Sequence, residues 1–166
     1  MSELRILPVE GIPEVHEGDD LAELVVRAVE LEDDDVVVLA QKIVSKAEGR
    51  VVRLDEVEPS ARALELAGDL DPRRVEVILR ESVEVVRVRP PLVIAETRHG
   101  FICASAGVDS SNAPEQGMLV LLPEDPDASA ARIRDGIPGA VVRGLHLRGD
   151  GKARDIAMPA ERDLFR

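Results

Sequence analysis

Sulfur and aromatic side chains are nearly missing from this chain. Its 166 residues include one cysteine, Cys103, no tryptophan, no tyrosine and two phenylalanines. A single cysteine excludes an intramolecular disulfide framework, and its place in an apolar run predicts a buried, inert thiol rather than a nucleophile. The core must be aliphatic, built on Val, Leu, Ile and Ala. With 45% hydrophobic residues, the length predicts one domain, or one domain with a small lobe.

Positive charge and long apolar runs are also scarce. The chain has 21 Lys and Arg against 33 Asp and Glu, a net charge of -12. Nucleic acids and anionic membrane surfaces both require a basic face, so this charge argues against either partner. No stretch approaches the ~20 apolar residues of a membrane span, and the first residues lack the pattern of a signal peptide. A cytoplasmic location is expected.

The common phosphate and zinc motifs do not occur. There is no Walker motif and no GxGxxG, so any phosphate site must be unconventional. With three isolated histidines and one cysteine, a zinc site is not expected. His99, in a turn before Phe101, could act as a general base or a ligand. A turn histidine without a visible partner is more often exposed and idle, and both interpretations stay open.

The most informative segment is the polar loop at residues 107–112, between two apolar runs that predict strands. Gly107 allows a positive φ or a close approach to a ligand. Asp109 is followed by two serines and by Asn112, the only asparagine of the chain. A carboxylate beside other hard oxygens suits Mg²⁺ or Mn²⁺. The same residues are also common in ordinary turns, because such side chains bond their own backbone.

Helix starts and apolar runs together predict the fold class. Helices are expected after the capping residues Asp20, Ser60, Asp71 and Asp125. The continuous Val run at residues 36–40 predicts a strand covered on both faces. Further strands are expected at residues 4–9, 83–88, 92–97, 101–104, 118–122 and 140–145. Because strands and helices do not alternate strictly, we predict an α+β fold with mixed sheets.

Three segments carry chemistry that suits a metal–nucleotide site. The Gly/Pro turn at residues 11–15 can offer backbone groups, and the loop at residues 109–112 offers a metal ligand. The segment from Gln41 to Lys46 follows the Val run, where ligand sites of α/β sheets commonly lie. Lys46 could place a point charge on a phosphate, although an ordinary surface lysine is the simpler interpretation.

Six motifs occur in a fixed order and together resemble one family. They are GIPE at 11–14, EGDDL at 17–21, KIVSKAEGR at 42–50, HGF at 99–101, AGVDSSN at 106–112 and LPEDPD at 122–127. This set resembles the coenzyme F-420-0:L-glutamate ligase family from about residue 4 to about residue 134. Each motif alone is weak, and their order makes the resemblance specific.

The resemblance implies a function and a set of site residues. It implies a ligase that joins L-glutamate to the coenzyme F-420 precursor through a γ-linked amide, using GTP and Mg²⁺ or Mn²⁺. The precursor carboxylate would be activated as an acyl phosphate, and the protein would be a homodimer. Asp109 would be a metal ligand. The nucleotide contacts would be Ile12, Pro13, Glu14, Val15, Gln41, Lys42, Lys46 and Asn112.

The resemblance also has a gap. After Arg134, family members continue into a segment that holds further metal ligands and part of the nucleotide pocket. Here residues 135–145 instead resemble the C-terminal region of the family. We therefore interpret residues 1–134 as the N-terminal part of a ligase-like domain and residues 135–166 as its C-terminal strand and tail, joined by an internal deletion. The alternative function is a catalytically inactive nucleotide-binding, metal-binding or interaction remnant of that family.

Overall fold

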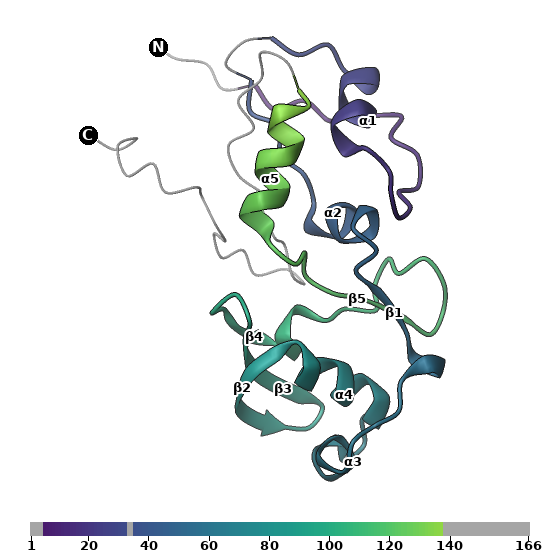
Figure 1. Cartoon of the computed structure of the whole chain (residues 1–166), viewed down its shortest axis with the longest axis vertical. Coiled ribbons are helices and arrows are strands. Elements are labelled where there is room, and N and C mark those ends of the chain that lie inside the picture. Colours follow the sequence, from purple (N-terminus) through teal and green to yellow (C-terminus); the bar gives the residue numbers. More distant parts are fainter. Residues whose placement is uncertain (1–4, 33–34, 138–166) are drawn as a thin grey trace, which may run out of the picture.

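Helices and small antiparallel sheets make up the molecule, as the predicted α+β class requires (Figure 1). The computed structural model describes residues 5–32 and 35–137. The α-helices are α1 (Leu21–Ala28), α2 (Gln41–Ala47), α3 (Ala61–Ala67), α4 (Pro72–Arg80) and α5 (Pro126–Asp135). The strands are β1 (Val51–Arg53), β2 (Ser82–Arg89), β3 (Leu92–Thr97), β4 (Ile102–Ala104) and β5 (Met118–Val120). Short 3-10 turns, η1 (Leu54–Glu56) and η2 (Ser105–Gly107), follow β1 and β4.

Four helices begin directly after the capping residues that the sequence predicts. Asp20, Ser60, Asp71 and Asp125 each accept a hydrogen bond from a backbone N–H in the first turn of α1, α3, α4 and α5, at 2.9–3.2 Å. A cap of this kind satisfies a donor that the helix itself cannot, which contributes about 1 kcal/mol. These four predicted helix starts are confirmed.

Two antiparallel sheets hold the strands. Strands β2, β3 and β4 form a three-stranded sheet in that order, with Val85 opposite Ala95 and Ala95 opposite Cys103. Strands β1 and β5 form a two-stranded ribbon in which Val51 lies opposite Val120. The predicted strands at residues 83–88, 92–97, 101–104 and 118–122 are thereby confirmed, whereas β1 was not predicted from the sequence. Cys103, expected to be buried, lies half-buried on β4.

The core is aliphatic, as predicted, and falls into separate clusters. One cluster joins α1, α2 and α5 through Val25, Val44 and Ile133. A second packs α4 against β3 and β5, and a small one joins α3 to α4. The β1–β5 ribbon lies between the two ends of the molecule (Figure 1). Leu121 belongs to the second cluster and Leu122 to the first, so consecutive residues after β5 serve both.

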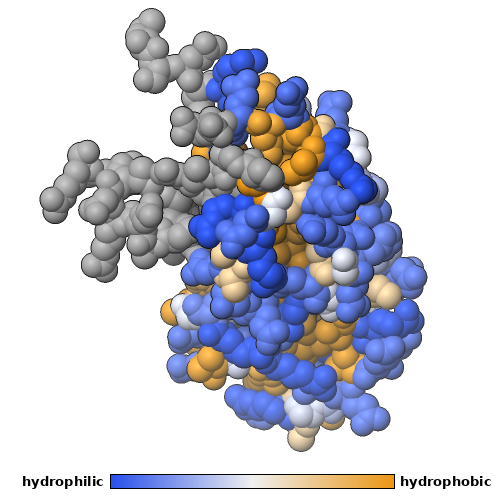
Figure 2. All heavy atoms as spheres, turned by 45° about the horizontal axis from the view of Figure 1, so that its top comes forward, coloured by the Kyte–Doolittle hydropathy of each residue, from blue (hydrophilic) through white to orange (hydrophobic). Residues whose placement is uncertain are grey.

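Two predicted strands are wrong. Residues 5–9 run as irregular chain, with Ile6 exposed at 86%. Residues 35–39 are not part of a sheet: Val37 and Leu39 are buried, whereas Val36 and Val38 are exposed, so the run is covered on one face only. The physical reason is that neither run pairs with a named strand within residues 5–32 and 35–137; only Ala40, at the end of the Val run, makes an isolated β-bridge. Figure 2 shows apolar surface between polar regions on the face that it presents.

The expected strand at residues 140–145 and most of the proposed C-terminal part, residues 135–166, lie outside the described residues. In the part of the chain that the structure describes, no helix is both long and apolar enough to cross a membrane.

Candidate functional site

Helix α2 places the two site lysines, although its sequence shows no capping residue. Ala40 precedes the helix and makes no side-chain cap. The start of the helix is fixed by tertiary contact instead, because the buried Gln41 amide donates to the Leu121 carbonyl at 2.8 Å and to Ser45 Oγ at 2.5 Å. Lys42 and Lys46 then lie one turn apart on one side of the helix. Gln41, predicted to contact the nucleotide, anchors α2 to the chain after β5.

The loop that carries Asp109 is shaped by its backbone. Gly107 has φ +75°, and a Cβ there would lie 2.7 Å from Leu122 Cγ. Asp109 follows, and its backbone N–H and C=O bond to the C=O and N–H of Val120 at 3.0 and 2.7 Å. The positive φ expected of Gly107 is thus confirmed, and the space that a Cβ would take is filled by the Leu122 side chain rather than by a ligand. The consequence is that Asp109 lies at the edge of β5.

The Asp109 carboxylate is held from three directions. Ser111 donates its backbone N–H to Oδ1 at 2.9 Å and its hydroxyl to Oδ2 at 2.6 Å. Lys42 Nζ lies 2.5 Å from Oδ2. Partial burial of the carboxylate acts to raise its pKa, but the hydrogen bonds from Lys42 and Ser111 outweigh it and lower the pKa of Asp109 to about 2. The group is therefore a carboxylate at neutral pH. The loop therefore combines the local hydrogen bonds of an ordinary turn, from Ser111 to Asp109, with a charged pair between Asp109 and Lys42.

The second loop, at residues 11–15, brings Glu14 to Lys46. Gly11 has φ +82°. Glu14 Oε1 lies 2.5 Å from Lys46 Nζ, with a side-chain exposure of 62% for the glutamate and 9% for the lysine. The hydrogen bond and the charge of Lys46 lower the pKa of Glu14. Lys46 is thus a mostly buried side chain whose charged end meets an exposed carboxylate, unlike the ordinary surface lysine considered above.

The remaining predicted nucleotide contacts lie around these two loops. Val15 is buried in the first core cluster, and Ile12 packs against the same cluster. Pro13 is exposed. Asn112 is exposed with φ +55°, directly after Ser111. Their assignment to a nucleotide stays a prediction.

The oxygens around Asp109 suit a hard divalent cation. The Asp109 carboxylate, the Ser111 hydroxyl and the Ser111 carbonyl all lie within hydrogen-bond reach of Lys42 Nζ, at 2.5–3.0 Å. Mg²⁺ commonly binds to one or two carboxylates and completes its shell with water and substrate phosphates. Among the described residues, no three His, Cys, Asp or Glu side chains are grouped to hold a metal. A cation bound at Asp109 would therefore take further ligands from the Ser111 oxygens, from water or from phosphates.

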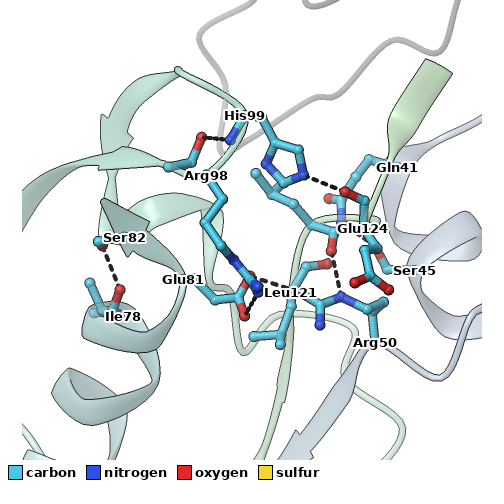
Figure 3. Close-up of polar contacts among 12 residues, drawn as sticks. Gln41, Ser45, Arg50, Ile78, Glu81, Ser82, Arg98, His99, Leu121 and Glu124 are labelled. Atoms are coloured by element: carbon cyan, nitrogen blue, oxygen red, sulfur yellow. Dashed lines mark hydrogen bonds and ion pairs between the residues drawn. The ribbon is translucent and has the colours of Figure 1, made fainter. Parts of the chain in front are cut away.

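A charged cluster at the junction of the two ends was not anticipated from the sequence (Figure 3). The carboxylate of Glu81, only 7% exposed, is bound by Arg50 at 2.6 Å and by Arg98 at 2.7 Å. Arg50 Nε also donates to the Leu122 carbonyl at 2.9 Å. The three residues are far apart in the sequence and share no local pattern that could have signalled their contact. Removing one arginine would leave a buried charge without full compensation.

His99 lies beside this junction, on the turn between β3 and β4 (Figure 3). Its Nε2 is 3.0 Å from the Glu124 carbonyl, and its ring stacks on Phe101 with centroids 5.9 Å apart. The ring is half-buried. Its Nδ1 is buried and has no hydrogen-bond partner among the described residues. His99 thus ties the β3–β4 turn to the chain before α5, and no contact joins it to Asp109, Lys42 or Lys46 in the part of the chain that the structure describes.

Comparison with known proteins gives a consistent result. The family described as F420-0:Gamma-glutamyl ligase matches residues 11–144. The coenzyme F420:L-glutamate ligase of Methanopyrus kandleri is 54% identical over 133 residues, which cover 79% of this chain and 52% of that protein. Proteins of the same name from Methanothermobacter thermautotrophicus and Haloarcula marismortui are 44% and 47% identical, over 86% and 81% of this chain and 59% and 54% of theirs. The chain thus spans little more than half the length of these relatives.

Proposed function

This chain belongs to the F420-0:gamma-glutamyl ligase family, and from that premise we propose that it is a GTP- and divalent-metal-dependent ligase that adds L-glutamate to the coenzyme F-420 precursor. The observation that carries the proposal is the arrangement on α2, where Lys42 and Lys46 meet the carboxylates of two separate loops. Two cations beside a preformed carboxylate suit a nucleotide whose phosphates arrive with a metal ion.

The proposed reaction has two steps. In the first, a carboxylate oxygen of the precursor attacks the γ-phosphorus of GTP, so that an acyl phosphate forms and GDP leaves. In the second, the amine of L-glutamate attacks the acyl carbon, phosphate leaves, and the amine loses a proton as the amide forms. Phosphoryl transfer of this kind depends mostly on positioning and on neutralising charge.

Each site residue has a role in this proposal. Asp109 holds Mg²⁺ or Mn²⁺, and the bound metal would neutralise phosphate charge. Lys46 would provide a positive charge for a phosphate, because its stem is buried and its ammonium, now paired with the exposed Glu14 carboxylate, faces the loop at residues 11–15. The turn from Ile12 to Val15 and the exposed Asn112 border the nucleotide, with Gln41 holding the start of α2 in place. We further propose a homodimer, which light scattering of the purified protein would test.

The test is a mass-spectrometric assay with purified protein, F-420 precursor, L-glutamate, GTP and Mn²⁺. We expect a product heavier by one glutamyl unit together with GDP, and loss of both in Asp109→Ala. Asp109→Asn keeps the size of the side chain but loses its charge, and should lose activity similarly. Full activity in either variant would contradict the role of Asp109.

A second function has two observations in its favour. No three His, Cys, Asp or Glu side chains of the described residues are grouped to hold a metal, and the chain spans little more than half the length of its relatives. A catalytically inactive remnant that binds nucleotide or metal would then be expected. It would bind GTP in calorimetry yet give neither GDP nor a glutamylated product, beside an active full-length relative. A stable oligomer without any GTP binding would indicate an interaction module instead.

A further inference from the structure

The ammonium group of Lys42 has the surroundings of a bound cation. It lies 2.5 Å from Asp109 Oδ2, 2.5 Å from Ser111 Oγ and 3.0 Å from the Ser111 carbonyl oxygen. An ammonium has three N–H donors and no acceptor, so three oxygens satisfy it fully. These are the carboxylate, hydroxyl and carbonyl oxygens that also suit Mg²⁺ or Mn²⁺. Lys42 thus occupies the position where the proposed metal would bind.

A metal ion and the Lys42 ammonium cannot share this position. A divalent ion binds oxygen at about 2.1 Å, whereas the ammonium is already 2.5 Å from Oδ2. Two cations on one carboxylate oxygen would repel each other strongly, since only part of the site is open to solvent and screening is weak there. The other carboxylate oxygen already accepts the backbone N–H of Ser111. Metal binding at Oδ2 therefore requires Lys42 to leave.

Only the 109–111 loop holds the Lys42 ammonium: among the described residues its hydrogen-bond and ion-pair partners are Asp109 and Ser111, although the side chain is only 19% exposed. Its flexible stem keeps the ammonium near α2, where the proposed function places the nucleotide phosphates. We propose that Lys42 is an internal substitute for the metal, which holds Asp109 and Ser111 in place until metal and nucleotide bind and which then moves to a phosphate. This inference rests on the proposed function.

The consequence is a coupling between the two ligands. Metal alone must compete with Lys42 for Asp109, so its affinity for the free protein is reduced. A nucleotide offers Lys42 another anion and thereby removes the competitor, which raises the affinity for metal. The resting ion pair also spares Asp109 the cost of an uncompensated charge in a partly buried site. Lys46 does not share this function, because its partner Glu14 belongs to the other loop.

The test measures binding of Mn²⁺ alone to the full chain, by the electron paramagnetic resonance signal of the free ion. Lys42→Met removes the competitor, and we expect its Mn²⁺ affinity to exceed that of the unchanged protein roughly tenfold, the size of one hydrogen bond to a charged group. Arg62→Met is the control for net charge, because it removes one positive charge from the exposed face of α3 without freeing Asp109. Its Mn²⁺ affinity should equal that of the unchanged protein. Lys42→Gln serves as a second variant should Lys42→Met fold poorly.

Asp109→Ala separates this inference from the proposed function. The chain carries a net charge of -12, so some Mn²⁺ will bind elsewhere, and this variant measures that background. If Asp109→Ala binds Mn²⁺ as the unchanged protein does, the metal site of the proposed function is wrong. If Asp109→Ala loses binding but Lys42→Met gains none, the metal site stands and the inference is overturned. Equal binding by Lys42→Met and Arg62→Met, or none detected in either, also overturns it.

A second readout follows the lysine itself. Acylation of amines by a small reagent, quantified by peptide mass spectrometry, reports whether Lys42 is held or free. We expect labelling of Lys42 to increase several-fold on saturation with Mn²⁺, while labelling of Lys46 stays constant as an internal reference. Unchanged labelling of Lys42 at saturating Mn²⁺ contradicts its displacement, whatever the binding data show.

Discussion

Two loops meet helix α2, and each brings a carboxylate to one of its lysines. Both begin with a glycine of positive φ, Gly11 in one and Gly107 in the other. Beyond this similarity they differ in how firmly they are held. A Cβ at Gly107 would clash with Leu122, and Asp109 is bound by Ser111 and paired with β5. A Cβ at Gly11 would meet nothing within 4 Å, and Glu14 is exposed.

The difference indicates a division of tasks within the site. The loop at residues 107–112 is preformed, because its backbone and its carboxylate are both fixed before any ligand binds. The loop at residues 11–15 is open, and its carboxylate is free to leave Lys46 when a stronger anion arrives. Preorganisation suits a metal ligand, whose oxygens must be at set distances, whereas an adaptable turn suits a larger ligand such as a nucleotide.

The largest expected effect compares the two glycines directly. Gly107→Ala combines a left-handed backbone with a steric overlap in the core, and we expect it to lower the free energy of unfolding by about 3 kcal/mol. Gly11→Ala has only the backbone cost, about 1 kcal/mol. Denaturant unfolding of both variants, compared at equal m-value, measures the difference. Equal losses at the two positions would mean that the loops are equally constrained.

The next prediction concerns Lys46, the α2 lysine that pairs with Glu14 of the open loop. Lys46→Met should weaken binding of a non-hydrolysable GTP analogue roughly 10- to 100-fold, the range expected for losing one hydrogen bond to a charged group. Calorimetric titration in the presence of Mn²⁺ gives the affinity. Arg53→Met, which removes an exposed positive charge on β1, is the control for net charge. A similar loss in both variants would indicate a general electrostatic effect and not a contact of Lys46.

The same comparison shows what the sequence could and could not predict. Local signals sufficed wherever one residue acts on its own neighbours: Asp71 caps α4, and Gly107 has the positive φ that its context suggested. Helix α2 was missed because its start depends on Gln41 contacting Leu121, eighty residues away. The paired strand expected from the Val run was wrong, because pattern indicates apolar faces but not whether a partner strand is present.

For the site, the sequence indicated the residues but not their contacts. Asp109 and Lys46 stood out as charged groups in suitable segments, yet no pattern shows that Lys42 pairs with the first and Glu14 with the second. No sequence pattern indicated the ion pairs of Glu81 with Arg50 and Arg98, because they join three segments that are far apart in the chain. Ion pairs between loops depend on the fold, and a single sequence contains that information only indirectly.

A smaller effect on the free energy of unfolding is expected when the pH is lowered. The pKa of Asp109 is lowered from 3.8 to about 2 in the folded protein. A group with a lowered pKa stabilises the fold above its unfolded pKa, and this contribution disappears as the pH falls from about 4 to about 2. A shift of this size equals roughly 2 kcal/mol, and because a third of the side chain is exposed we expect about 1 kcal/mol. Unfolding free energies between pH 5 and 2 measure it.

The control for the acid effect is Asp109→Asn, which has no carboxylate to titrate at this position. The unchanged protein should lose more stability than the variant over this pH range, so that the two curves converge toward pH 2. Parallel curves would show that the ion pair with Lys42 does not form in solution, which would also remove the basis for the metal-substitute role of that lysine.

The smallest effect is expected at the open loop. Glu14→Gln keeps the shape of the side chain but releases Lys46 from an ion pair that a nucleotide would otherwise have to break. Lys46 lowers the pKa of Glu14, so the carboxylate is charged at neutral pH and competes with phosphate throughout the physiological range. Removing that charge should raise the affinity for the GTP analogue about twofold to threefold, because exposed ion pairs contribute little. Calorimetry at two salt concentrations is the measurement, with a smaller gain expected at high salt. A clear loss of affinity would instead show that Glu14 itself binds the nucleotide, and the contrast between a preformed loop and an adaptable one would then no longer hold.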